Sequence, residues 1–103
     1  MISSIVVTTY PDVETAARAS KTLVKKKLAA CANIADIRSI YLWKGKLEDI
    51  RESLVIMKTR KSRVPQLRKA IEKSHPYEVP EIAEIPVASL NEKYLDWLNG
   101  SVR

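Results

Sequence analysis

The chain has 103 residues, a formal net charge of +6, 46% hydrophobic residues and 29% charged residues. This length suits a single domain, residues 1–103, and the composition argues against a disordered chain or a fibrous rod. Glycine occurs only at Gly45 and Gly100, so the sequence contains no glycine-rich phosphate loop. The basic balance favours anionic partners as a class.

Cysteine content and hydropathy bear on the compartment. Cys31 is the single cysteine, so an intramolecular disulfide cannot form, which favours a reducing compartment. No apolar run approaches the roughly 18–20 residues that a membrane span needs. The first residues lack the basic and long apolar regions of a signal peptide. We therefore expect a soluble, cytoplasmic protein with no membrane partner.

The first half of the chain predicts a strand, a helix and a hairpin. Residues 2–9 are β-branched and apolar, which is typical of a strand. Asp12 is suited to be the N-cap of a helix whose apolar face continues to Leu28. Two further strands are expected over residues 30–44 and 47–60, joined by a tight turn at Lys44, Gly45 and Lys46.

The second half predicts a helix, a strand and a terminal helix. Ser62 is expected to be the N-cap of a helix that runs to residue 74. Residues 81–87 favour a strand. Ser89 and Glu92 have the spacing of a capping box for the last helix, and Gly100 is expected to end that helix.

This order is β-α-β-β-α-β plus a C-terminal helix, which predicts an α+β, ferredoxin-like fold. Right-handed crossovers place both main helices on one face of a four-stranded antiparallel sheet. Each arm of the central hairpin has about 12–14 residues and could span about 40 Å, more than the roughly 25–30 Å of such a domain. The tip carries the apolar run 40–43. An uncovered apolar hairpin is an aggregation hazard, so we expect another subunit to cover it.

The order of several short segments points to one family. They are LAACANI at 28–34, YLWKGK at 41–46, Lys58-Thr59, HPYEVPEI at 75–82 and YLDWL at 94–98. Together they resemble the CutA family of divalent-cation tolerance proteins, over essentially the whole chain from Ile5 to Arg103. The resemblance implies a cytoplasmic homotrimer joined through the long hairpin around Tyr41 and Trp43. It also implies an assembly like that of the PII-type regulators and a role in tolerance to copper and other divalent cations.

His75 is the single histidine and our candidate metal ligand, since imidazole is a common ligand of copper and zinc. The other reading of His75 is a cap at a helix C-terminus. The resemblance places metal ligands at a first-strand cysteine and at two adjacent histidines. Here Thr8 and Ser74 occupy two of those positions, and only His75 remains. We therefore expect weak binding of copper or another divalent cation, unless three symmetry-related His75 side chains converge.

Two other groups each leave two interpretations open. Cys31 lies in an apolar segment and is expected to act as a small hydrophobic residue rather than a metal or redox group. An acidic row could bind hard cations weakly, together with carboxylates of the hairpin, or could pair with Lys and Arg across a subunit interface. The row is Glu78, Glu81 and Glu84, and the hairpin carboxylates are Glu48, Asp49 and Glu52.

The basic run 58–63 supports an alternative function. Lys58, Arg60 and Arg63 could hold a small anionic metabolite between subunits, as in a PII-like trimeric regulator. Nucleic acid is not expected, because the strand aromatics Tyr41 and Trp43 both lie at the hairpin end. No nucleophile motif is present, so we expect no catalytic residues, no enzyme activity and no cofactor other than the divalent cation.

Overall fold

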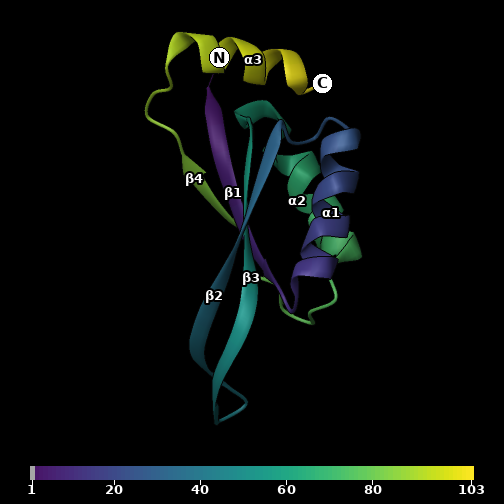
Figure 1. Cartoon of the computed structure of the whole chain (residues 1–103), viewed down its shortest axis with the longest axis vertical. Helices are drawn as coiled ribbons and strands as arrows, with labels where there is room; N and C mark the ends of the chain where they lie inside the picture. Colours follow the sequence, from purple (N-terminus) through teal and green to yellow (C-terminus); the bar gives the residue numbers. More distant parts are fainter. Residues whose placement is uncertain (1) are drawn as a thin grey trace.

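The computed structural model describes residues 2–103 and has the ferredoxin-like α+β arrangement that the sequence predicts (Figure 1). A short 3-10 turn, η1, covers Lys61–Arg63. The other elements are β1 Ser3–Tyr10, α1 Val13–Lys25, β2 Cys31–Trp43, β3 Lys46–Arg60, α2 Val64–Ser74, β4 Ala83–Pro86 and α3 Glu92–Ser101.

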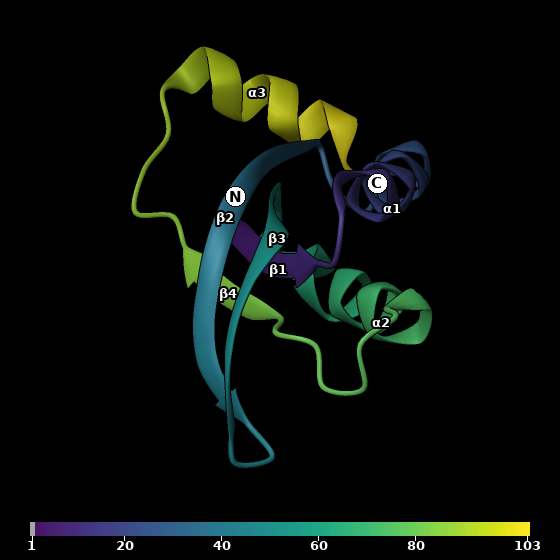
Figure 2. The same ribbon diagram turned by 60° about the horizontal axis from the view of Figure 1, so that its bottom comes forward.

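One four-stranded sheet, in the order β2-β3-β1-β4, is antiparallel throughout. Helices α1 and α2 lie side by side on one face of it, as Figures 1 and 2 show from two directions. Val55 and Met57 of β3 are fully buried and pack with Leu67 and Ile71 of α2. Because side chains alternate along a strand, Glu52 and Leu54 belong to the opposite face.

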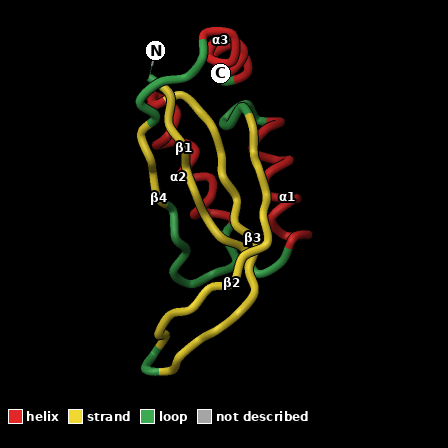
Figure 3. The backbone as a smooth tube through the Cα atoms, turned by 60° about the vertical axis from the view of Figure 1, so that its left-hand side comes forward, coloured by secondary structure: helices red, strands yellow, loops and turns green. Residues whose placement is uncertain are grey.

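The central hairpin leaves the sheet. Strand β3 pairs with β1 only over residues 53–60, whereas its pairing with β2 continues down to Lys46. Figure 3 shows both hairpin strands continuing beyond the other two strands. The molecule therefore measures 45 Å along its longest axis and only 25 and 21 Å along the others. The turn has Lys44 and Gly45 at φ of 50° and 79°, the left-handed values of a tight hairpin turn.

The ends of α1 follow ordinary capping rules. The carboxylate of Asp12 accepts a hydrogen bond of 2.7 Å from the backbone N–H of Thr15, which confirms the predicted N-cap. The helix ends at Lys25, before the predicted Leu28, because Lys27 adopts a left-handed φ of 60°. The Leu28 N–H then bonds to the Leu23 carbonyl, as in a Schellman motif.

Three predicted boundaries were wrong. Ser62 is not an N-cap, because the Lys61 N–H is held by the Ile2 carbonyl and residues 61–63 form η1 before α2 starts. Ser89 forms no capping box, since Asn91 is the N-cap of α3. Gly100 lies inside α3, where the Ser101 hydroxyl donates to the Trp97 carbonyl one turn earlier.

Strand β4 is shorter than the predicted 81–87, because it pairs with β1 only along residues 4–7. Helix α3 crosses the end of the sheet far from the hairpin tip (Figure 1) and buries Leu98 against Ala30. Among residues 2–103, no helix has the length and hydropathy needed to cross a bilayer.

Candidate functional site

His75 is held at a corner between α2 and the segment that leads to β4. A residue before proline is driven to an extended conformation, so α2 ends where Pro76 follows, and His75 has φ −72° and ψ 135°. Strand β4 covers the outer edge of β1 only as far as Val7. The edge of β1 beyond Val7 is therefore free for a side chain, and the His75 ring lies there.

Both ring nitrogens of His75 have hydrogen-bond partners. The backbone N–H of Tyr77 donates to Nδ1 at 3.1 Å, so the ring proton belongs on Nε2. Nε2 lies 2.8 Å from the Thr9 carbonyl and donates to it, with the Thr8 hydroxyl 3.3 Å away. The imidazole thus satisfies a carbonyl of the free strand edge and an N–H of the following turn.

An aromatic stack fixes the plane of the same ring. Tyr10 and His75 lie nearly parallel, at 13°, with ring centroids 4.4 Å apart. Burial lowers the pKa of His75, an effect that the Thr9 hydrogen bond and the charge of Glu52 only partly oppose. The fold therefore favours the neutral imidazole, which is the form that binds metals.

A second hydrogen bond ties this corner to the hairpin. The Tyr77 hydroxyl donates to the Glu52 carboxylate at 2.5 Å, and Glu52 is only 8% exposed. Burial and the neighbouring carboxylate raise the pKa of Tyr77 far above its ordinary value, so the phenol stays a donor. Glu52 lies one residue beyond Ser53, the last β3 residue that pairs with β1, so the link closes the junction where the hairpin leaves the sheet.

A cleft of about 720 Å³ opens beside this junction. It lies on the sheet face away from α1 and α2, because its strand residues include Ile37 and Glu52, which are directly opposite each other in the β2–β3 ladder. Aromatic rings and carboxylates share the lining. The rings are those of Tyr41, Trp43 and Tyr77, and the carboxylates are those of Glu48, Glu52, Glu78 and Glu81.

The other predicted metal positions do not gather into a ligand set around His75. Thr8 is buried beside His75, as its place in β1 requires, but Ser74 turns back and donates to the Ala70 carbonyl. Cys31 contacts Asn33 and lines a different cavity, between α1 and α3. Within residues 2–103 there is no group of three or more His, Cys, Asp or Glu side chains arranged to hold a metal ion.

Several predicted acidic groups pair within the chain. Glu84 accepts from Lys61 at 2.6 Å and from Ser4 at 2.7 Å, which lowers the pKa of Glu84. Glu78 lies 3.9 Å from Lys44 at the hairpin turn. These two members of the acidic row therefore have intramolecular cations.

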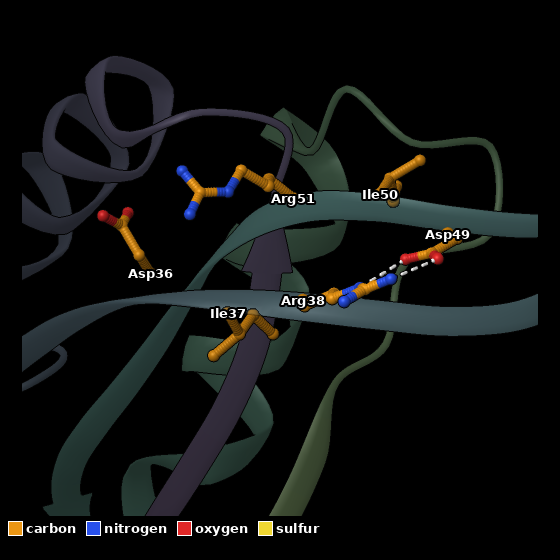
Figure 4. Close-up of a pocket in the computed structure, with 6 residues that line it drawn as sticks. All are labelled: Asp36, Ile37, Arg38, Asp49, Ile50 and Arg51. Carbon is orange, nitrogen blue, oxygen red and sulfur yellow. Dashed lines mark hydrogen bonds and ion pairs between the residues drawn. The ribbon is translucent and has the colours of Figure 1, made fainter.

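A hollow of about 450 Å³ lies along the hairpin, lined by three consecutive residues of β2 and three of β3 (Figure 4). Arg38 extends toward Asp49 on the opposite strand, with Ile37 and Ile50 beside them (Figure 4). Two hydrogen bonds of 2.8 and 2.7 Å join Arg38 and Asp49. Both side chains are largely in solvent, so this pair contributes chiefly to cross-strand register.

The basic residues proposed for anion binding also have partners in the chain. The Lys58 ammonium lies over the Tyr94 ring, 5.7 Å from its centroid. The Arg63 guanidinium donates to the Arg103 carbonyl at the end of the chain. Both contacts attach α3 and the last residues to the sheet, which is a structural role.

Comparison with known proteins places the chain in a family. Residues 4–101 match the model of the CutA1 divalent ion tolerance protein family. The chain belongs to the CutA family. The divalent-cation tolerance protein CutA of Pyrococcus horikoshii is 47% identical over 94 residues, which cover 91% of this chain and 92% of that protein.

Two further relatives differ in their stated location. Protein CutA 1, chloroplastic, of Oryza sativa is 40% identical over 98% of this chain and 58% of its own length. The structure described as the periplasmic divalent cation tolerance protein CutA from Archaeoglobus fulgidus superposes with a TM-score of 0.95 at 37% identity, over 98% of this chain and 99% of that chain. The CutA fold predicted from the sequence is thereby confirmed.

Sequence reasoning missed the ring that stacks on His75 and the buried hydrogen bond that joins Tyr77 to Glu52. The stacking of Tyr10 had no local signal, because 65 positions, two helices and the whole hairpin separate Tyr10 from His75. Glu52 had a weak signal, since an acidic residue in an apolar strand pattern calls for a buried donor. Tyr77 lies in the HPYEVPEI segment that carries the resemblance, and the structure gives its hydroxyl a definite partner in Glu52.

Removal of the Tyr77 hydroxyl tests the link to the hairpin. Tyr77→Phe leaves a buried carboxylate without its donor, so we expect a loss of about 1–3 kcal/mol in the free energy of unfolding. Denaturant titration measures this loss. Glu52→Gln in the Tyr77→Phe background should restore part of the loss, whereas additive effects of the two substitutions would contradict the pairing.

The state of His75 predicts a pH dependence. Its pKa is lower in the folded chain than in the unfolded one, so as the pH falls below about 6.5 the unfolded chain binds a proton first. The free energy of unfolding should therefore decrease from about pH 6.5 downward. Thermal denaturation at several pH values measures this decrease. The His75→Gln variant should show a flatter dependence of the free energy of unfolding on pH just below pH 6.5. An unchanged slope in that variant would refute the assignment.

Proposed function

We propose that the chain is a homotrimeric divalent-cation response protein that binds copper or another divalent cation weakly beside the junction of hairpin and sheet. Its membership of the divalent-cation tolerance family supports the cation class. The observation that supports assembly is the overhanging hairpin, whose large apolar side chains are left exposed by residues 2–103. The cation would be substrate or signal rather than a resident cofactor.

The apolar surface of the hairpin supports assembly. Ile40, Leu42 and Leu47 are 63%, 71% and 64% exposed, although they are large aliphatic residues. Together with Tyr41 and Trp43 they form an apolar patch at the end of the molecule that is farthest from its core. Strand β2 is also an edge strand of 13 residues, whose outer hydrogen-bonding groups invite another strand.

The corner both attracts a cation and limits how tightly it can be held. The hydrogen bonds of His75 and the lack of further nitrogen or sulfur ligands weaken binding, whereas the carboxylates of the neighbouring cleft favour it. The imidazole of His75 is neutral but engaged at both nitrogens, so a metal must displace a hydrogen bond that contributes about 1 kcal/mol. The carboxylates of the neighbouring cleft supply negative potential in a basic chain. Copper and zinc prefer three or four nitrogen or sulfur ligands, which one imidazole does not provide.

We extend the proposal to enzyme activity, location and anion binding. We expect no enzyme activity, because the single histidine is committed to the fold at both nitrogens. We expect the cytoplasm as location on the strength of the lone cysteine, although relatives are described as chloroplastic or periplasmic. A PII-like anion site at Lys58 and Arg63 is less favoured, since both already have partners.

Assembly through the hairpin predicts a mass about three times the chain mass of 11.7 kDa in sedimentation equilibrium. Leu42→Asp should lower the measured mass to that of one chain, because the substitution places a charge in the apolar patch. The matched control is Gln66→Asp on exposed α2, which should leave the mass unchanged. A wild-type mass of one chain would refute the proposed trimer.

Copper titration by calorimetry tests the cation site. His75→Ala should weaken Cu²⁺ binding by about tenfold or more, since the site has no second imidazole. Cys31→Ser is the matched control and should bind Cu²⁺ as the wild type does. Equal affinities of wild type and His75→Ala would exclude His75, and loss of binding in Cys31→Ser would assign the metal to the thiol.

A further inference from the structure

A groove of about 620 Å³ separates α1 and α2 on the outer face of the molecule. Its volume is in the range of sites for small organic ligands, about 300–1,000 Å³. The two helices lie side by side there (Figures 1 and 2), and the floor includes Ala19, Leu23 and Ala70. The alanines fill little of the space between the helices, which leaves the hollow open. This groove is on the far side of the sheet from the acidic cleft.

Three cations line the groove, and no carboxylate does. Arg18 lies in α1, Lys26 is the C-cap of α1 and Lys73 lies in α2, and all three are exposed. No ion pair involves them among residues 2–103. Arg18 and Lys26 are eight positions apart, about 12 Å along the helix, and Lys73 faces them from α2. Arg18 interacts electrostatically with Asp12 at the start of α1, and the Asp12 carboxylate also accepts the Thr15 N–H.

A buried hydroxyl gives independent evidence for a ligand. Tyr10 lines the groove and is only 1% exposed, and its hydroxyl has no hydrogen-bond partner in the described chain. Burial raises the pKa of Tyr10, so the phenol keeps its proton. A buried hydroxyl without an acceptor is unfavourable and uncommon in native structures. Tyr10 lines this groove and lines neither the acidic cleft nor the hollow along the hairpin.

We propose that the groove between α1 and α2 binds a small phosphorylated anion. Its phosphate oxygens accept hydrogen bonds from Arg18, Lys26 and Lys73 and from the Tyr10 hydroxyl. Its carbon skeleton rests on the apolar floor. The site is separate from the cation site and from the basic run 58–63, so the protein would bind a cation and an anion on opposite faces of one sheet.

Calorimetry with ATP, pyrophosphate and inorganic phosphate, in a buffer with chelator and no divalent cation, tests the proposal independently of metal binding. Wild type should bind at least one of these probes, more weakly at high salt. Arg18→Ala and Lys73→Ala should each weaken binding about tenfold or more. The matched control, Lys21→Ala, removes the same charge from the other side of α1 and should bind as wild type does.

Tyr10→Phe separates a ligand role from a structural one. It should leave the melting temperature of the free protein unchanged or higher, because it removes an unpaired hydroxyl, and it should weaken binding of the same probe. Absence of binding at millimolar concentrations of all three probes would overturn the proposal. Equal weakening by Lys21→Ala and Lys73→Ala would also overturn it, since it would mean attraction to net charge alone.

Discussion

Strand β3 lies in two environments, and the rest of the structure depends on that division. Its second half is paired on both sides and carries the core residues Val55 and Met57. Its first half has only β2 as a partner and extends into solvent. A two-stranded ribbon is marginally stable alone, so it must draw stability from the sheet at one end and from another molecule at the other. Glu52 lies next to the boundary between the two halves.

The His75 corner binds this boundary to the helical layer. A chain of contacts runs from Tyr10 through the stacked imidazole to Tyr77 and then to Glu52. It connects β1, the end of α2 and the hairpin, which are separate in sequence. Because the imidazole must be neutral and hydrogen bonded to serve there, the fold and a metal compete for the same nitrogens. Weak and reversible cation binding is the physical consequence that we propose.

Charge is divided between the two faces of the sheet. The cleft beside the hairpin collects Glu48, Glu52 and Glu81, while the groove between the helices collects Arg18, Lys26 and Lys73. The net charge of +6 describes neither the acidic cleft nor the basic groove, because it is the sum over the whole chain. Opposite potentials on opposite faces suit binding of a cation and an anion to the same protein without mutual interference.

The sequence by itself determined the order of elements, the fold class, the hairpin overhang and the family. Those features depend on local periodicity, turn residues and strand length, all of which can be read directly from the linear sequence. Helix boundaries such as Ser62 and Gly100 failed because distant contacts, including the Ile2 carbonyl on Lys61, override local capping preferences. Short-range rules contain no information on those partners.

Only the tertiary structure decided what surrounds His75 and which cations share a groove. Arg18, Thr22 and Lys26 recur every four positions, so their common helix face was readable, but the approach of Lys73 from α2 was not. Likewise, Tyr10 and His75 meet because β1 and the end of α2 converge where β4 stops. Sites built from several elements are set by packing geometry, which a linear pattern does not encode.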